Sequence, residues 1–134
     1  MRSEAGLRQA AAKKVRTEEA TADRRKPTES SAKIFRDLML GFVRIHLLYH
    51  ASIEPIYGSG ISAELASHGY KLSWGTLYPL LHSLEAEGLL TREDRVVDGK
   101  VRKYYRATPR GRRALDEARR RALDLVAEIT DTPS

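Results

Sequence analysis

The chain has 134 residues and a formal net charge of +6, and it contains no cysteine. This length suits one domain with a tail, and the lack of cysteine excludes disulfides and thiolate chemistry. Arg44 and His46 interrupt the longest apolar stretch, which is too short to span a bilayer. The N-terminus lacks the apolar segment of a signal peptide. The default expectation is therefore a soluble, intracellular protein of the cytoplasm.

The positive charge is concentrated in one segment of the chain. Residues 92–113 hold nine basic and three acidic side chains, an excess of +6 that equals the excess of the whole chain. A localised basic patch is the pattern expected for a protein that binds a polyanion. A pair of solvated basic strands would have the same composition, so charge alone does not separate the two interpretations.

Residues 1–30 are rich in Ala, Glu, Lys and Arg and contain no aromatic side chain. They can bury too little apolar surface to offset the entropy of ordering, which predicts a disordered or frayed basic tail. A basic arm along DNA phosphates is the functional alternative. Ser30 or Ser31 is then expected to cap a helix over about residues 34–50. Apolar residues nearly encircle this helix, which indicates burial against a partner subunit as well as against the core.

Glycine and serine residues mark the ends of the next two predicted helices. A glycine-rich link at residues 57–60 leads to a short helix over 61–68 that ends at Gly69. After a brief extended piece, Ser73 is expected to cap a helix that ends at Gly88. Within this helix, four leucines recur at helical spacing and must be buried: Leu77, Leu80, Leu81 and Leu84.

The opposite face of the Ser73–Gly88 helix is unusual because it carries no charge. An ordinary solvated face would hold Glu and Lys, whereas this one holds small, hydroxyl-bearing or ring-bearing residues: Gly75, Thr76, Tyr78, Pro79, His82 and Ser83. Such a flat face suits close approach to another surface. Beside a basic hairpin, it indicates a helix that reads the DNA major groove while the hairpin grips phosphates.

Residues 89–97 and 100–107 predict two strands joined by Asp98-Gly99, a dipeptide typical of a two-residue hairpin turn. In this register Val96 pairs with Val101 and Asp94 with Lys103, and Arg95 lies opposite Arg102. Facing like charges destabilise a hairpin. Their presence is explained if a phosphate lies between or near them.

The last helix is predicted to begin at Thr108-Pro109, with the threonine as cap and the proline in the first turn. Apolar residues then follow at heptad-like spacing: Leu115, Ala118, Ala122, Leu125 and Ile129. A narrow apolar seam on a terminal helix predicts a partner helix from another subunit. Packing within the same chain is the alternative.

The stretch from about Phe35 to Leu125 resembles the PadR family of winged-helix transcriptional regulators. The resemblance rests on SWGTLYPLLHSLEAEGLL (residues 73–90), VDGKVRKYYRATPRG (residues 97–111) and ISAELASHGY (residues 61–70). It implies a mainly α, α+β fold in the order helix, helix, helix, β-hairpin, helix. Residues 31–108 would form the winged helix-turn-helix DNA-binding domain, and residues 109–134 the C-terminal dimerisation helix.

The resemblance also implies a homodimer that binds a near-palindromic operator in double-stranded DNA and usually represses. Its dimer contacts would come from the first and last helices, here through Ile34, Leu38, Phe42, Leu115, Ala118, Ala122, Leu125 and Ile129. Some family members release DNA when a phenolic or other small aromatic effector binds between the subunits. Ser83 stands where the family often has a basic residue.

The DNA-binding candidates divide between the helix and the hairpin. In the helix they are Ser73, Gly75, Thr76, Tyr78 and His82. Thr76 can reach a base edge or a phosphate, and Gly75 allows close backbone approach at a helix N-terminus, which attracts phosphate. Tyr78 is expected near a phosphate by the family resemblance. His82 either touches the groove or is merely exposed, and Trp74 is expected to pack rather than contact bases. In the hairpin, Lys100, Arg102 and Lys103 are the phosphate candidates, with Arg95 a weaker one.

Two classes of protein remain as alternatives. A winged-helix protein-interaction module would keep the helix order without needing the neutral face or the opposed arginines. A small hydrolase or metalloprotein would rest only on His46 and His50, four residues apart on one helix. Because no acidic or further histidine partner lies nearby in sequence, packing is favoured there, and no metal, cofactor or catalytic residue is assigned. The chain contains no nucleophile motif and no nucleotide-binding fingerprint.

Overall fold

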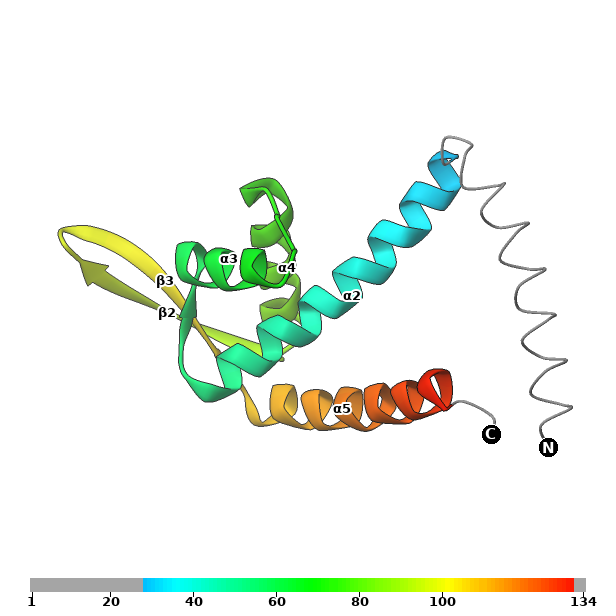
Figure 1. Ribbon diagram of the computed structural model, residues 1–134. Coiled ribbons are helices and arrows are strands. Elements are labelled where there is room, and N and C mark those ends of the chain that lie inside the picture. Colours follow the sequence, from blue (N-terminus) through cyan, green and yellow to red (C-terminus); the bar gives the residue numbers. More distant parts are fainter. Residues whose placement is uncertain (1–27, 132–134) are drawn as a thin grey trace, which may run out of the picture. The chain divides into compact units, whose positions relative to one another are not determined.

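The computed structural model describes residues 28–131 (Figure 1). The elements follow in the order α2 (Glu29–Ile53), β1 (Ile56–Tyr57), α3 (Gly58–Ser67), α4 (Trp74–Ala86), β2 (Leu90–Val97), β3 (Lys100–Ala107) and α5 (Pro109–Thr130). Residues 38–122 form one compact unit, and the described ends of the chain, 28–37 and 123–131, belong to a second. The predicted order of helices and hairpin is confirmed. Residues 1–27 of the predicted tail lie outside the described residues.

The hydrophobic core lies within the 38–122 unit and draws on every element of it. The largest side chains that are almost wholly buried are Tyr105, Leu47, Leu65, Leu77, Leu81, Leu90 and Val43. Each buried aliphatic side chain contributes about 1.5–3 kcal/mol relative to its exposed state. The four leucines predicted to face inward from α4 are all buried, which confirms the helical periodicity.

Helix α2 begins earlier and ends later than the predicted range 34–50. The hydroxyl oxygen of Thr28 accepts a hydrogen bond from the backbone N–H of Ser31 at 3.1 Å, so Thr28 caps the helix instead of Ser30 or Ser31. The buried residues of α2 all come from its second half: Val43, Leu47, Leu48 and Ala51. Tertiary packing therefore favours a helix that runs to Ile53.

The glycine-rich link at residues 57–60 contributes Tyr57 to the two-residue strand β1 and supplies the first turn of α3. Ile56 pairs with Tyr105 and Tyr57 with Tyr104, which makes a three-stranded antiparallel sheet in the order β1-β3-β2. So short a strand has no periodicity of its own. It exists because β3 offers it a partner edge.

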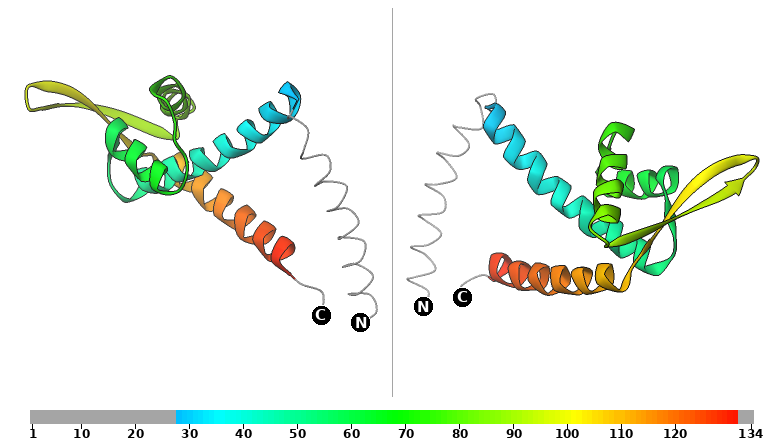
Figure 2. Two further views of the ribbon diagram at one scale, coloured as in Figure 1. Left: turned by 45° about the horizontal axis from the view of Figure 1, so that its top comes forward. Right: turned by 180° about the vertical axis from the view of Figure 1, so that it is seen from behind.

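The hairpin has the predicted turn and register. Asp98 and Gly99 have φ values of 52° and 77°, as a type I′ turn requires. Val96 faces Val101, Asp94 faces Lys103 and Arg95 faces Arg102. Figure 2 shows the hairpin projecting beyond α3 and α4.

A network of hydrogen bonds around Thr108 joins the end of α4 to the start of α5. Gly88 has φ 77° and ends α4 as predicted. The Thr108 hydroxyl donates to the Gly88 carbonyl at 2.6 Å and accepts from the Gly111 N–H at 2.9 Å, which confirms Thr108 as the cap of α5. The Thr108 N–H also donates to the carbonyl of Leu89 at 3.1 Å. One threonine thus links the segment between α4 and β2 to the start of α5.

Leu115 corrects the predicted dimer seam. Its side chain is only 6% exposed and packs in the core of the protomer. The first turns of α5 lie against the 38–122 core, so an apolar residue there is buried within its own chain. The exposed apolar residues of α5 come later in the helix.

No helix among residues 28–131 combines the length and apolar character that a bilayer span would need.

Candidate nucleic-acid interface

The face of α4 opposite its leucines is accessible to solvent. Trp74 is 48% exposed, the side chains of Pro79 and His82 are exposed, and Thr76 and Tyr78 are half-buried. Ser73 lies at the N-cap position, but its hydroxyl makes no cap hydrogen bond and lies instead 3.2 Å from the hydroxyl of Thr76. The helix therefore presents two hydroxyl groups at its N-terminus, beside backbone N–H groups that favour an anion.

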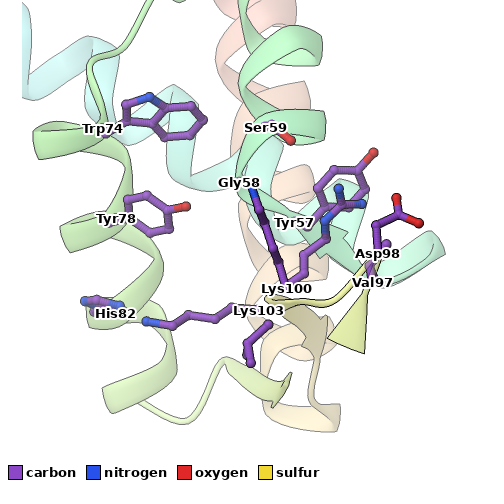
Figure 3. A pocket seen from close by; sticks show the side chains of 12 residues that line it. Tyr57, Gly58, Ser59, Trp74, Tyr78, His82, Val97, Asp98, Lys100 and Lys103 are labelled. Atoms are coloured by element: carbon purple, nitrogen blue, oxygen red, sulfur yellow. The ribbon is translucent and has the colours of Figure 1, made fainter. Parts of the chain in front are cut away.

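An open groove of about 780 Å³ runs between α4 and the hairpin, with the turn from β1 into α3 along its length (Figure 3). Trp74, Tyr78 and His82 form the α4 wall. The hairpin wall and the groove's floor come from Tyr57, Gly58, Ser59, Val97, Asp98, Lys100, Val101, Arg102 and Lys103. In Figure 3 the ammonium group of Lys103 points toward His82. Five of the predicted DNA-binding residues thus line one groove: Tyr78, His82, Lys100, Arg102 and Lys103.

The rings on the α4 wall form a column at i, i+4 spacing. The centroids of Trp74 and Tyr78 are 5.5 Å apart, and those of Tyr78 and His82 are 6.2 Å apart. Gly58 allows this arrangement, because a Cβ there would lie 2.7 Å from the Tyr78 hydroxyl oxygen and 3.3 Å from Cζ3 of Trp74. Trp74 packs as expected, but against Tyr78 and Gly58 rather than in the leucine core. The ring spacing was visible in the sequence, whereas the role of Gly58 was not.

The opposed arginines of the hairpin avoid each other by stacking on different rings. The Arg102 guanidinium lies 4.3 Å from the centroid of Tyr57, and the Arg95 guanidinium lies 4.5 Å from that of Tyr104. The two tyrosine rings are 5.4 Å apart. These contacts, with the 3.0 Å ion pair from Arg95 to Glu93, offset the repulsion without a phosphate between the charges. Tyr57 was missed by the sequence argument because its partner strand is distant in the chain.

The cations of the hairpin differ in how far they are neutralised. Arg92 is paired with Asp94 at 3.4 Å and Arg95 with Glu93. In the described part of the chain, Lys100, Arg102 and Lys103 have no carboxylate within ion-pair distance. The groove is therefore bordered by three cations that form no ion pair within residues 28–131.

The remaining sequence candidates lie outside the groove. Tyr105 is the inward tyrosine of the predicted alternating pair, and Tyr104 is half-buried. In α2, Ile34, Leu38 and Phe42 are exposed, and in α5 so are Ala122, Leu125 and Ile129, with Ala118 half-buried. His46 and His50 lie in α2 near His68 and Glu64.

Comparison with known proteins decides the family. A family model described as "Transcriptional regulator PadR-like family" matches residues 47–117, which are more than half of the chain. The chain belongs to the PadR-like family of transcriptional regulators. Regulators of this family bind DNA and are typically dimeric.

Relatives of this PadR-like protein include one curated regulator. Over 94 residues the chain is 51% identical to "Transcriptional regulator Rv3488" of Mycobacterium tuberculosis, and the alignment covers 70% of this chain and 88% of the relative. The relative is named as a transcriptional regulator.

Solved structures confirm the winged-helix fold. A PadR family regulator from Eggerthella lenta aligns with a TM-score of 0.63 at 34% identity, covering 76% of this chain and 93% of that one. A PadR-like transcription factor from Bacteroides fragilis gives a TM-score of 0.64 at 28% identity, covering 72% and 95%. The unit that holds the groove is therefore a PadR-type fold.

Proposed function

We propose that this PadR-like regulator binds a near-palindromic operator in duplex DNA as a homodimer and represses transcription. The observation that carries the proposal is the arrangement across one groove: an uncharged, solvent-accessible face of α4 lies opposite cations that form no ion pair within residues 28–131. DNA has the matching features: neutral base edges in the major groove and phosphates along its rim.

In this proposal α4 enters the major groove with its N-terminus toward the DNA. Ser73 and Thr76 offer hydroxyl groups to base edges or phosphates, and Gly75 lets the backbone approach closely. Tyr78 donates its hydroxyl to a phosphate. His82, one turn further along the same wall, completes the contact surface.

The hairpin supplies the sequence-independent part of the affinity. Lys100, Arg102 and Lys103 are proposed to contact phosphates, because they line the groove and have no ion-pair partner among residues 28–131. Arg95 is assigned a smaller share, since its pair with Glu93 must loosen before it can bind a phosphate. Each phosphate contact releases condensed counterions and so steepens the dependence of affinity on salt.

The homodimer is proposed to use α2 and α5. Each helix carries exposed large apolar residues that a partner subunit would cover: Ile34, Leu38 and Phe42 on α2, and Leu125 and Ile129 on α5. Ala118 and Ala122 fit the same seam of α5, while Leu115 is withdrawn from it. Two-fold symmetry in the protein would match a near-palindromic site in DNA.

A small aromatic effector between the subunits is part of the proposal by family analogy. The exposed aromatic residues of α2 that support it are Phe35, Phe42 and Tyr49. Calorimetry with a panel of phenolic compounds tests this point separately, and a panel without binding heat would refute an effector of that class.

A salt titration of binding to mixed-sequence duplex DNA is the first experiment. A phosphate-gripping hairpin predicts that affinity falls steeply and linearly on a log–log plot. A protein-interaction module would show weak binding with little dependence on salt, and that result would contradict the proposal.

The matched variant is Lys103→Glu. In a homodimer it removes two phosphate contacts, so the log–log slope should become shallower by about two, and affinity should fall for every duplex sequence. Arg121→Glu is the control, because it makes the same charge change on α5 at a side chain that is 82% exposed. If Lys103→Glu and the wild type bind DNA with equal affinity at low salt, the proposal that the hairpin contacts DNA is contradicted.

A further inference from the structure

Three of the four histidines of the chain meet at one place in the fold. His46 and His50 lie one turn apart on α2, and His68 follows the last residue of α3. The rings of His46 and His50 stack at 6.3 Å with an interplanar angle of 9°, and the ring of His68 lies 4.9 Å from that of His46. One ring nitrogen from each of the three lies within 4.8 Å of the others.

A carboxylate lies beside two members of this histidine cluster, His50 and His68. Oε1 of Glu64 lies 3.3 Å from Nε2 of His68 and 3.7 Å from Nε2 of His50. In a tetrahedral zinc site with bonds of about 2.0–2.1 Å, neighbouring ligand atoms are about 3.4 Å apart. The Glu64 contacts with His50 and His68 are already near this separation. The histidine nitrogens lie within 4.8 Å of one another and would need to close by up to about 1.4 Å, which rotations of partly exposed side chains allow.

We propose that His46, His50 and His68, together with Glu64, bind a divalent transition-metal ion of the zinc class. Imidazole and carboxylate are the ligands that such ions prefer. The site joins α2 to α3 within one protomer, so it needs no second subunit. It is separate from the DNA groove, whose lining includes none of these four residues.

The surroundings of the cluster suit a metal site in one further way. A cavity of about 230 Å³ lined by His50, Glu54 and Glu64 lies beside it and gives an ion a route from solvent.

The test uses the full chain without an added histidine tag, stripped with a chelator and titrated with Co²⁺ and then Zn²⁺. Four-coordinate Co²⁺ gives intense visible absorption, and because the chain lacks cysteine no sulfur-to-metal band should accompany it. We expect one ion per chain, loss of the colour when Zn²⁺ displaces Co²⁺, and a higher melting temperature with Zn²⁺.

His68→Gln is the deciding variant, because this side chain is 48% exposed and its loss should leave the fold intact, as thermal unfolding without metal would verify. Its metal affinity should fall by more than about a hundredfold, since even a residue that only orients a ligand is worth about 10- to 100-fold. His82→Gln, which alters the one histidine outside the cluster, should bind metal like the wild type. No visible Co²⁺ spectrum in the wild type, or equal affinity in His68→Gln, would overturn the site.

Discussion

At the scale of single residues, stability depends on side chains whose neighbours cannot be read from the local sequence. Tyr105 is one of these. It is fully buried in the core, whereas the adjacent Tyr104 stacks with Tyr57 and Arg95 on the other face of the strand. Among the described residues the hydroxyl of Tyr105 makes no hydrogen bond of normal geometry, and burial raises its pKa although the nearby Arg92 acts in the opposite direction. A buried hydroxyl without a good hydrogen bond lowers the free energy of unfolding.

Removing this hydroxyl should not weaken the fold. We expect Tyr105→Phe to raise the free energy of unfolding by about 1 kcal/mol, because it removes a buried polar group that has no partner while keeping the ring. Urea denaturation of both proteins measures the difference. Tyr104→Phe serves as comparison, since its half-buried hydroxyl should change stability little. A clear loss of stability in Tyr105→Phe would show that the hydroxyl is satisfied in solution.

Gly111 is the residue that allows α5 to start where it does. A Cβ at this position would lie 2.0 Å from the carbonyl oxygen of Leu89, which is backbone and cannot swing aside. We expect Gly111→Ala to destabilise the protein by about 2 kcal/mol or more, as steric overlap in a packed region does. Thermal unfolding checks it. Gly75→Ala is the control, because its nearest neighbour would be at 3.8 Å, and its stability should not fall.

At the scale of elements, the start of α5 shows how local and distant signals combine. The Thr108-Pro109 pair predicts the start of a helix from the local sequence alone. The Thr108 hydroxyl does more, since it joins Gly88 at the end of α4 to the N–H of Gly111. The start of α5 is therefore tied to the end of α4, the helix that we propose reads DNA.

Thr108→Ala should expose this dependence. Loss of the cap and of the bond to Gly88 should cost about 1–2 kcal/mol of stability, while Thr108→Ser, which keeps the hydroxyl, should lose much less. Chemical denaturation of the two variants against the wild type is the measurement. Equal losses in both would mean that the methyl group of Thr108, and not its hydroxyl, stabilises this junction.

At the scale of the whole molecule, the proposed dimer depends on apolar surface that the protomer leaves uncovered. Leu125 is 50% exposed on α5, while Leu115 of the same helix is buried. We expect Leu125→Glu to shift the protein from dimer to monomer in sedimentation velocity, because the new carboxylate would have to be desolvated in the seam. Arg121→Glu on the same helix should stay dimeric. A Leu125→Glu protein that sediments as a dimer would place the interface elsewhere.

Features that depend on a few neighbouring residues were predictable from the sequence: the Asp98-Gly99 turn and its register, the end of α4 at Gly88, the cap at Thr108 and the leucine face of α4. Each follows from backbone geometry or side-chain periodicity that acts within a few residues. The motifs of α4 and the hairpin were also enough to indicate the family, because they are local as well.

Only the tertiary structure decided the features that need residues from distant elements. Strand β1 exists because β3 pairs with it, Leu115 is buried because α5 starts against the core, and Gly58 is needed because Tyr78 and Trp74 lie above it. His68 joins His46 and His50 in the same way, through the packing of α3 beside α2. Such contacts form when the chain folds to bury its apolar side chains. Which side chains then become neighbours depends on how their shapes pack together and not on their distance along the sequence.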